Sequence, residues 1–175
     1  MRTHLSALVL LALNFLIFLV LNQFLNPHPD MLDHWVWSRF LSASYYEHPP
    51  IVAFLIRIIT TIGGHHETTL EIGAQLVNLS ILYLIYLLAL SIFHTRAALF
   101  TILVLSSMPY FTLGTVFLHI TQPFVFCWVL ALMLLVRYHR EPHPRWLIFI
   151  GVVCGLEPYP SSSCFFFILG FSFMR

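Results

Sequence analysis

The chain has 175 residues, of which 59% are hydrophobic and 9% charged, and its mean hydropathy is +0.89. A soluble domain carries about 25% charged residues, so these charges are too few to cover a surface that faces water. The net charge is only +1, and all eight basic residues are arginines. The composition therefore excludes a disordered tail, a nucleic-acid binder and an ordinary cytosolic enzyme.

Long apolar runs predict an all-α, polytopic membrane helical bundle. The run Leu5–Leu25 is long enough for a spanning helix of about 20 residues, and no small-residue cleavage site follows it, so we expect this helix to be retained. Leu70–Phe93 predicts a second span. Ala97–Val136 has no acid or arginine and is too long for one span, so we expect two helices joined near residues 119–122. The residues expected to break this run are Pro109, Gly114 and Pro123.

Three further segments carry shorter apolar patterns. Ile51–Ile62 is apolar but short, which favours an interfacial or re-entrant helix over a full span. Leu32–Leu41 is rich in aromatic residues and can form a short surface helix at headgroup depth. Trp146–Met174 is interrupted by two prolines and predicts two short helices or one broken helix.

The arginines favour one orientation of the chain in the membrane. If the N-terminus is cytoplasmic, most arginines fall on the cytoplasmic side and five of the seven acids fall outside. This bias holds only if Ile51–Ile62 does not cross. We therefore expect a multi-pass protein of the inner (plasma) membrane, with residues 26–69 as an extracytoplasmic loop. The arginines expected on the cytoplasmic side are Arg2, Arg96, Arg137, Arg140 and Arg145.

The expected outer loop contains two acids just beyond the first span, Asp30 and Asp33. A carboxylate in this position can act as a general base toward a hydroxyl group. The alternative is a solvated loop acid or an N-cap of the surface helix. Spacing alone favours the alternative, so a catalytic assignment needs further support.

Basic side chains follow in the same loop. Glu47 and His48 stand ahead of a proline pair, and Pro50 suits the first turn of the next helix. His48 would then lie near a helix N-terminus, where backbone N–H groups attract anions; the alternative is a capping or turn histidine. Arg57 lies within an apolar helix and needs a partner or a headgroup phosphate.

The second predicted span also contains polar residues. Glu71, Gln75 and Asn78 share one helical face, where they can line a cavity or join helices by hydrogen bonds, and we favour hydrogen bonding. The sequence contains no nucleotide-binding loop and no metalloprotease motif. It predicts no metal site.

The loop from Asp30 to Gly64 resembles the first outer loop of GT-C glycosyltransferases. More narrowly, it is similar to the bacterial branch of the dolichyl-phosphate-mannose protein mannosyltransferase family, which includes the aminoarabinose transferases of lipid A. The family pattern runs D-E-x-Y-Y-W-x-W-S and then Y-Y-[DE]-H-P-P-L. Here residues 30–38 read D-M-L-D-H-W-V-W-S, and residues 45–51 read Y-Y-E-H-P-P-I.

The chain also departs from the family pattern. Met31 replaces a glutamate and His34 replaces a tyrosine. Residues 121–123 read T-Q-P where the family usually has Thr-Pro-Asp, so a second acid is lost. Residues 157–161 read E-P-Y-P-S where a Ser-Lys-Tyr-Thr stretch is common, so a lysine is lost.

The resemblance implies an inverting transfer of a sugar from a polyprenyl-phosphate donor to a lipid, glycan or protein acceptor at the outer face of the membrane. It gives the role of base or acceptor-orienting group to Asp30, with Asp33 as the alternative, and the donor-phosphate contact to His48. We add Arg57 as a second phosphate contact. Supporting roles fall to Glu47, Tyr45 and Tyr46. The lipid-linked sugar is a substrate, and no further cofactor is predicted.

Family enzymes are much longer, so residues 1–175 are expected to be the amino-terminal portion of a GT-C-like domain. Its expected partners are membrane lipid, the lipid-linked donor and a missing carboxy-terminal half, with no nucleic acid. Two other hypotheses stay open. The lost acid and lysine favour a non-catalytic remnant or assembly partner of the same fold. A small transporter would use its intramembrane polar residues, namely Glu71, His119 and Glu157.

Overall fold

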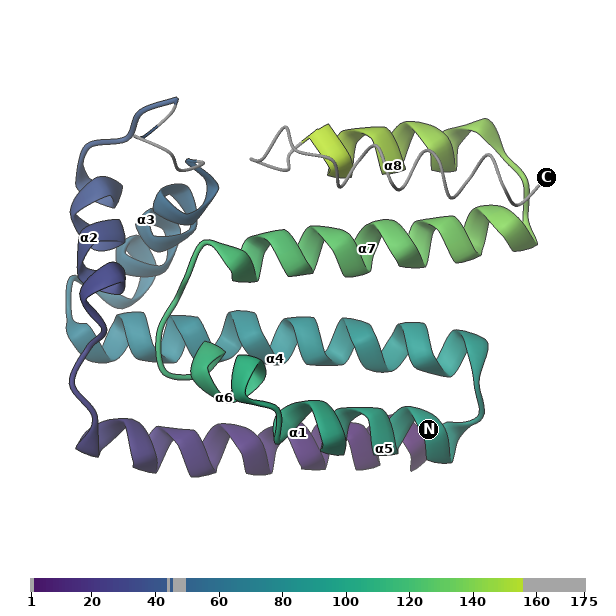
Figure 1. Ribbon diagram of the computed structural model, residues 1–175, viewed down its shortest axis with the longest axis horizontal. Coiled ribbons are helices and arrows are strands. Elements are labelled where there is room, and N and C mark those ends of the chain that lie inside the picture. The colour runs from purple at the N-terminus through teal and green to yellow at the C-terminus, as the bar shows by residue number, and fades with distance from the viewer. Residues whose placement is uncertain (1, 44, 46–49, 156–175) are drawn as a thin grey trace.

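The structure, a computed structural model, describes residues 2–43, 45 and 50–155, and within them the regular elements are helices (Figure 1). This confirms the all-α expectation. In chain order the elements are α1 (Arg2–Leu21), η1 (Asn22–Phe24), α2 (Pro29–Arg39), α3 (Ile51–Gly63), α4 (Glu67–Ile92), α5 (Thr95–Ser106), α6 (Pro109–Gly114), α7 (Thr121–Arg140) and α8 (Pro144–Gly155).

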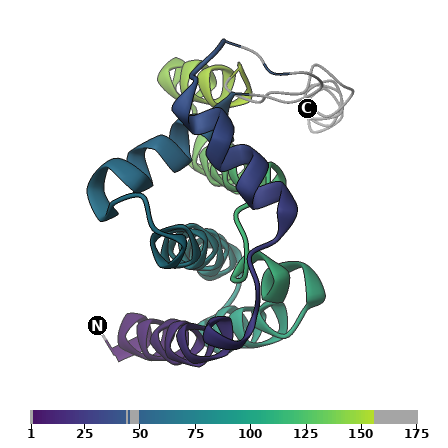
Figure 2. The same ribbon diagram turned by 90° about the vertical axis from the view of Figure 1, so that its left-hand side faces the viewer.

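The long helices α1, α4 and α7 run side by side, and α2 and α3 lie across one end of them (Figures 1 and 2). We call this the loop end, because it also holds the connection between α6 and α7. The opposite end, which we call the turn end, holds the α4–α5 and α7–α8 turns. The bundle therefore separates the acids that follow α1 from the arginines in the two turns.

Three of the described helices are long and apolar enough to cross a membrane by length and composition: His4–Phe24, Glu67–Ile92 and Thr121–Arg140. Many of their large apolar side chains are exposed, such as Leu16, Ile17 and Leu76, each more than half exposed. Exposed apolar helix faces are stable against lipid and costly in water. The chain is therefore a membrane protein.

The run Ala97–Val136 forms three helices instead of the two expected. The extra break falls after Ser106, because Pro109 occupies the first turn of a separate short helix, α6. The expected break near residues 119–122 is present, and α7 begins at Thr121. Pro123 does not break the run, since it lies in the first turn of α7, where a proline costs no hydrogen bond.

Helix α2 begins at Pro29, three residues before the predicted start. The N-cap is His28, whose side chain accepts a hydrogen bond from the backbone N–H of Asp30. Neither Asp30 nor Asp33 is therefore the N-cap that was considered for this helix. Pro29 supports the early start, because proline is pre-organised for the first helical position.

Helix α3 matches the predicted Ile51–Ile62 segment to within one residue. It is anchored by the fully buried side chains Val52, Ala53 and Ile56, and it ends before Gly64, whose φ of 86° suits a residue without a side chain. The helix stays at the loop end and does not run the length of the bundle (Figure 1). The helix is too short to count among the candidate spans, and the orientation that depends on its not crossing stays a prediction.

A hydrophobic cluster at the loop end joins four segments. Met31 of α2, Val52 and Ile56 of α3, Leu70 of α4 and Leu118 of the α6–α7 connection all bury nearly their whole surface in it. Burial of each such side chain contributes about 1.5–3 kcal/mol. The cluster fixes α2 and α3 on α4 and on the α6–α7 connection.

Three buried amides close the far side of this connection. Asn78 donates to the Phe111 carbonyl at 2.9 Å, Asn22 donates to the Thr115 carbonyl at 3.1 Å, and Gln122 donates to the Gly114 carbonyl. These carbonyls lie at the end of α6, where a helix leaves its last C=O groups unpaired. The amides of α4, η1 and α7 therefore cap α6 inside the bundle.

Candidate active site at the start of helix α2

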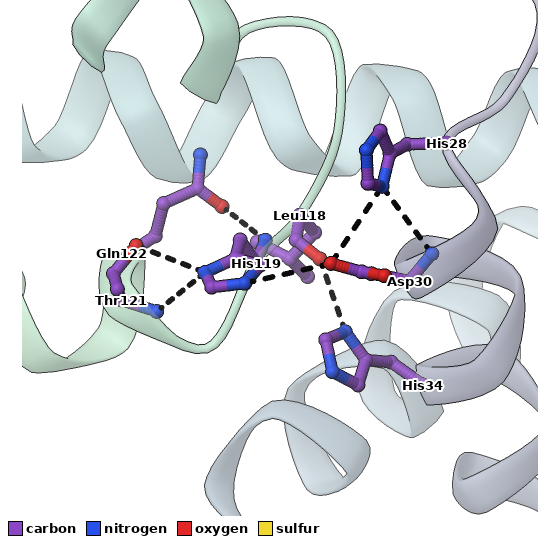
Figure 3. Close-up of polar contacts among 7 residues, drawn as sticks. All are labelled: His28, Asp30, His34, Leu118, His119, Thr121 and Gln122. Atoms are coloured by element: carbon purple, nitrogen blue, oxygen red, sulfur yellow. Dashed lines mark hydrogen bonds and ion pairs between the residues drawn. The ribbon is translucent and has the colours of Figure 1, made fainter.

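Asp30 lies in the first turn of α2 with half of its side-chain surface exposed. Two imidazoles flank the carboxylate (Figure 3): Oδ2 is 3.7 Å from Nδ1 of His28 and 3.7 Å from Nε2 of His119. The positive end of the helix macrodipole favours a negative charge in this turn. Asp30 is therefore an accessible carboxyl group at the start of a helix, with an imidazole on either side.

The two histidines face Asp30 with different atoms. Nδ1 of His28 accepts the backbone N–H of Asp30 at 3.3 Å, so the neutral ring has no proton there for the carboxylate. Nδ1 of His119 receives the backbone N–H and the hydroxyl of Thr121, at 3.3 and 3.2 Å. This network assigns the proton of neutral His119 to Nε2, the atom that faces Asp30. If both rings are neutral, His119 is the one of the two that presents an N–H to the carboxylate, although both distances are equal.

The α6–α7 connection is attached to α2 by three contacts. Nδ1 of the buried His34 donates to the Leu118 carbonyl at 3.4 Å. The ring of His28 stacks on Phe117, with 4.2 Å between centroids and 13° between planes. Met31 packs in the same cluster as Leu118. These contacts place His119 next to Asp30, 89 positions earlier in the chain.

Gln122 holds the other side of His119. Its Oε1 accepts the backbone N–H of His119 at 3.1 Å, and its Nε2 donates to the Gly114 carbonyl (Figure 3 shows the first contact). One buried side chain thus bridges both ends of the 114–119 segment. The backbone that presents His119 is fixed by this bridge and by Thr121.

The remaining predicted residues that the structure describes do not join this group. Asp33 lies one turn further along α2, and Arg57 lies in the middle of α3; both are exposed, and within the described residues neither side chain forms an ion pair. Tyr45 stacks on Trp37 and donates to the carbonyls of Trp37 and Phe40, at 3.0 and 2.9 Å. Tyr45 therefore caps the C-terminus of α2.

The other predicted residues of this loop are Tyr46, Glu47 and His48, which lie outside the described residues. Sequence reasoning did not pair His119 with Asp30, although a signal was present. His119 stands in the polar break between two apolar runs, and the expected topology places that break on the same side as residues 26–69. Counting spans would therefore have brought the two segments to one membrane face.

Two apolar grooves meet on α4. One, of about 430 Å³, lies between α3 and α4 and includes Ile59, Ile62 and Ile72 in its lining. The other, of about 520 Å³, lies between α1 and α4, and both include Leu76 and Ser80. Together they form an apolar path that starts at the loop end. The linings of both grooves are mostly apolar side chains.

Comparison with known proteins gives one match. The family described as dolichyl-phosphate-mannose-protein mannosyltransferase matches residues 47–170, more than two thirds of the chain. No curated protein and no solved structure matches the chain. The matched range begins after α2, so Asp30 lies outside it, whereas His119, Gln122 and both turns of the turn end lie inside it.

Proposed function

Because the chain belongs to the dolichyl-phosphate-mannose-protein mannosyltransferase family, whose members are membrane glycosyltransferases of the GT-C type, we propose that it transfers a sugar from a polyprenyl-phosphate donor to a hydroxyl group. The acceptor is a lipid, a glycan or a protein at the outer face of the membrane. The observation that carries this proposal is the exposed Asp30 carboxylate, held at a helix N-terminus against the His119 imidazole.

In the proposed reaction Asp30 accepts the proton of the acceptor hydroxyl. The hydroxyl oxygen forms a new bond to the anomeric carbon, while the bond from that carbon to the phosphate oxygen breaks and the phosphate leaves with the electron pair. Attack from the opposite face inverts the anomeric carbon. A positioned base of this kind contributes about 10²–10⁴-fold to the rate.

His119 orients the Asp30 carboxylate in this proposal. Its Nε2–H faces Oδ2, and the 3.7 Å separation is an ion-pair distance only when the ring is protonated. With a neutral ring, a small closing movement brings Nε2–H within hydrogen-bond range. The second carboxylate oxygen is then left for the acceptor.

The leaving phosphate is assigned to cationic side chains of the same loop. His48 and Arg57 remain the proposed contacts, because an imidazolium and a guanidinium both stabilise a developing phosphate anion. The apolar path on α4 supports a lipid-linked donor, since it offers a polyprenyl chain a surface beside α3. The orientation with the loop end outside follows from the positive-inside rule.

The test is sugar transfer in membranes that contain the full chain, supplied with polyprenyl-phosphate hexoses and pentoses. Asp30→Asn keeps the shape and removes the charge, so we expect transfer to fall at least about 100-fold at equal protein level. Asp33→Asn is the matched control, one turn along the same helix, and should retain transfer. If Asp33→Asn abolishes transfer and Asp30→Asn does not, the assignment of the base is wrong.

Histidine variants test the phosphate contact. His48→Ala should raise the donor KM more than it lowers kcat, and His48→Lys should retain more activity, because lysine also meets a phosphate as a point charge. A parent chain that transfers none of these sugars, with both aspartate variants behaving like it, would instead support the non-catalytic alternative. Solute uptake that depends on Glu71 would support the transporter.

A further inference from the structure

Two arginines stack on one tryptophan at the turn end. The guanidinium carbon of Arg137, in the last turn of α7, is 4.8 Å from the ring centroid of Trp146, and that of Arg145, in the first turn of α8, is 4.7 Å from it. Cation–π attraction explains each contact separately. It does not explain why two like charges are held around one ring.

A third arginine and two histidines lie near this pair. Arg140, His139 and His143 are exposed in the same turn, and the one acid there, Glu141, is exposed and forms no ion pair with any described residue. The two guanidinium charges around one ring repel each other. A bound anion would remove that repulsion.

The backbone N–H groups of Arg145 and Trp146 donate to Nδ1 and the carbonyl of His143. The guanidinium groups of Arg137 and Arg145, in contrast, form no hydrogen bond or ion pair with a described residue. A guanidinium that stacks on a ring keeps its in-plane N–H groups available for a bidentate anion. The first turn of α8 contains no acid to offset the positive end of its macrodipole. The buried indole N–H of Trp146 has no acceptor among the described residues. The chemistry of the turn therefore matches a phosphate group.

The neighbouring surface of α8 identifies the source of that phosphate. Directly after Trp146, the side chains of Leu147, Ile148, Phe149 and Val152 are between 43% and 66% exposed. Such a surface is stable against acyl chains, and a tryptophan beside it is typical of headgroup depth. We propose that Arg137, Arg145 and Trp146 form a binding site for the phosphate headgroup of an anionic phospholipid.

This site is distinct from the general effect of arginines on topology. The positive-inside effect depends on how many cationic residues lie near a span end and not on which ones. The proposed site depends on Arg137 and Arg145. Arg96, exposed at the same end at the start of α5, provides a matched control for the loss of a charge.

The experiment measures phosphatidylglycerol binding to the purified full chain, by native mass spectrometry and by thermal stabilisation on titration into phosphatidylcholine micelles. We expect phosphatidylglycerol to bind in preference to phosphatidylcholine. R137Q/R145Q should weaken its binding at least about tenfold, the loss expected for charge-assisted hydrogen bonds. Arg96→Gln should change it less than about twofold. Equal losses in both variants, or equal binding of the two lipids by the parent, would overturn the proposal.

Two further measurements test the stacked geometry and the lipid source of the phosphate. R137K/R145K keeps the charge count and therefore the insertion, but loses the stacked, bidentate geometry. It should also bind phosphatidylglycerol several-fold more weakly than the parent. Unchanged binding in this variant contradicts the stacked site. Inorganic phosphate should not reproduce the stabilisation, and if it does, the ligand is a free anion and the lipid assignment is wrong.

Discussion

Replacing Gly114 by alanine should damage the amide caps of α6 selectively. A Cβ atom at this position would lie 2.8 Å from Nε2 of Gln122 and 2.9 Å from Oδ1 of Asn78. Both side chains are almost fully buried and donate to the Gly114 and Phe111 carbonyls. Neither side-chain amide can move away from the added Cβ atom without breaking its hydrogen bond.

The expected loss follows from those two bonds. Each buried group left unpaired costs about 1–3 kcal/mol, so the loss of both hydrogen bonds costs about 2–6 kcal/mol. The higher helix propensity of alanine offsets about 1 kcal/mol of this cost. The net destabilisation is therefore about 1–5 kcal/mol. In a protein of this size that corresponds to a fall of about 2–20 °C in the unfolding midpoint.

The assay is thermal unfolding in detergent, with Gly151→Ala as control. Gly151 lies within α8, and a Cβ added there meets no atom within 4 Å, so this variant should unfold at the parent temperature or slightly above it. Equal midpoints for the two alanine variants would refute the reasoning. That result would mean that the two amides can form equivalent hydrogen bonds with other groups.

Three further outcomes are expected. Tyr45→Phe removes the hydroxyl that accepts from the Ser42 N–H and donates to two carbonyls at the end of α2, and should cost about 0.5–1.5 kcal/mol, seen as faster proteolysis near residue 42. Gly64→Ala forces a side chain onto a φ of 86° and to 3.1 Å from His66, and should cost about 1–3 kcal/mol in thermal unfolding. Single cysteines at Thr68 and Thr95, in a background without native cysteines, should react with an impermeant reagent from opposite membrane faces; labelling from one face refutes the topology.

Much of the fold could be predicted because apolar length and proline position act locally. Helix α3 was predicted to within one residue, since its apolar run begins after a proline pair and ends at two glycines. Hydrogen bonding was also expected for the polar face of α4, and Asn78 confirms it. Gln75 does not, because neither of its buried polar atoms has a partner among the described residues.

The failures arose where distant groups decide the local structure. Pro123 was predicted to break a helix. Whether a proline does so depends on its distance from the helix start. Here residues 119–122 set the start of α7, so Pro123 falls in its first turn. His28 is the N-cap of α2 and its ring also stacks on Phe117, a contact that no local pattern reveals. The approach of His119 to Asp30 likewise joins segments that are far apart in the sequence. The roles of both residues in catalysis stay predictions.

The attachment of α2 to the α6–α7 connection has a consequence for biosynthesis. The bonds from His34 to Leu118 and from Asn22 to Thr115 span 84 and 93 positions of sequence. At about 5–20 residues per second, the ribosome needs on the order of 4–20 seconds to make that interval. For this time α2 lacks its contacts with the α6–α7 connection, and the carboxylate of Asp30 lacks the neighbouring imidazole of His119. Asp30 and His119 can therefore come together only after the α6–α7 connection has been synthesised.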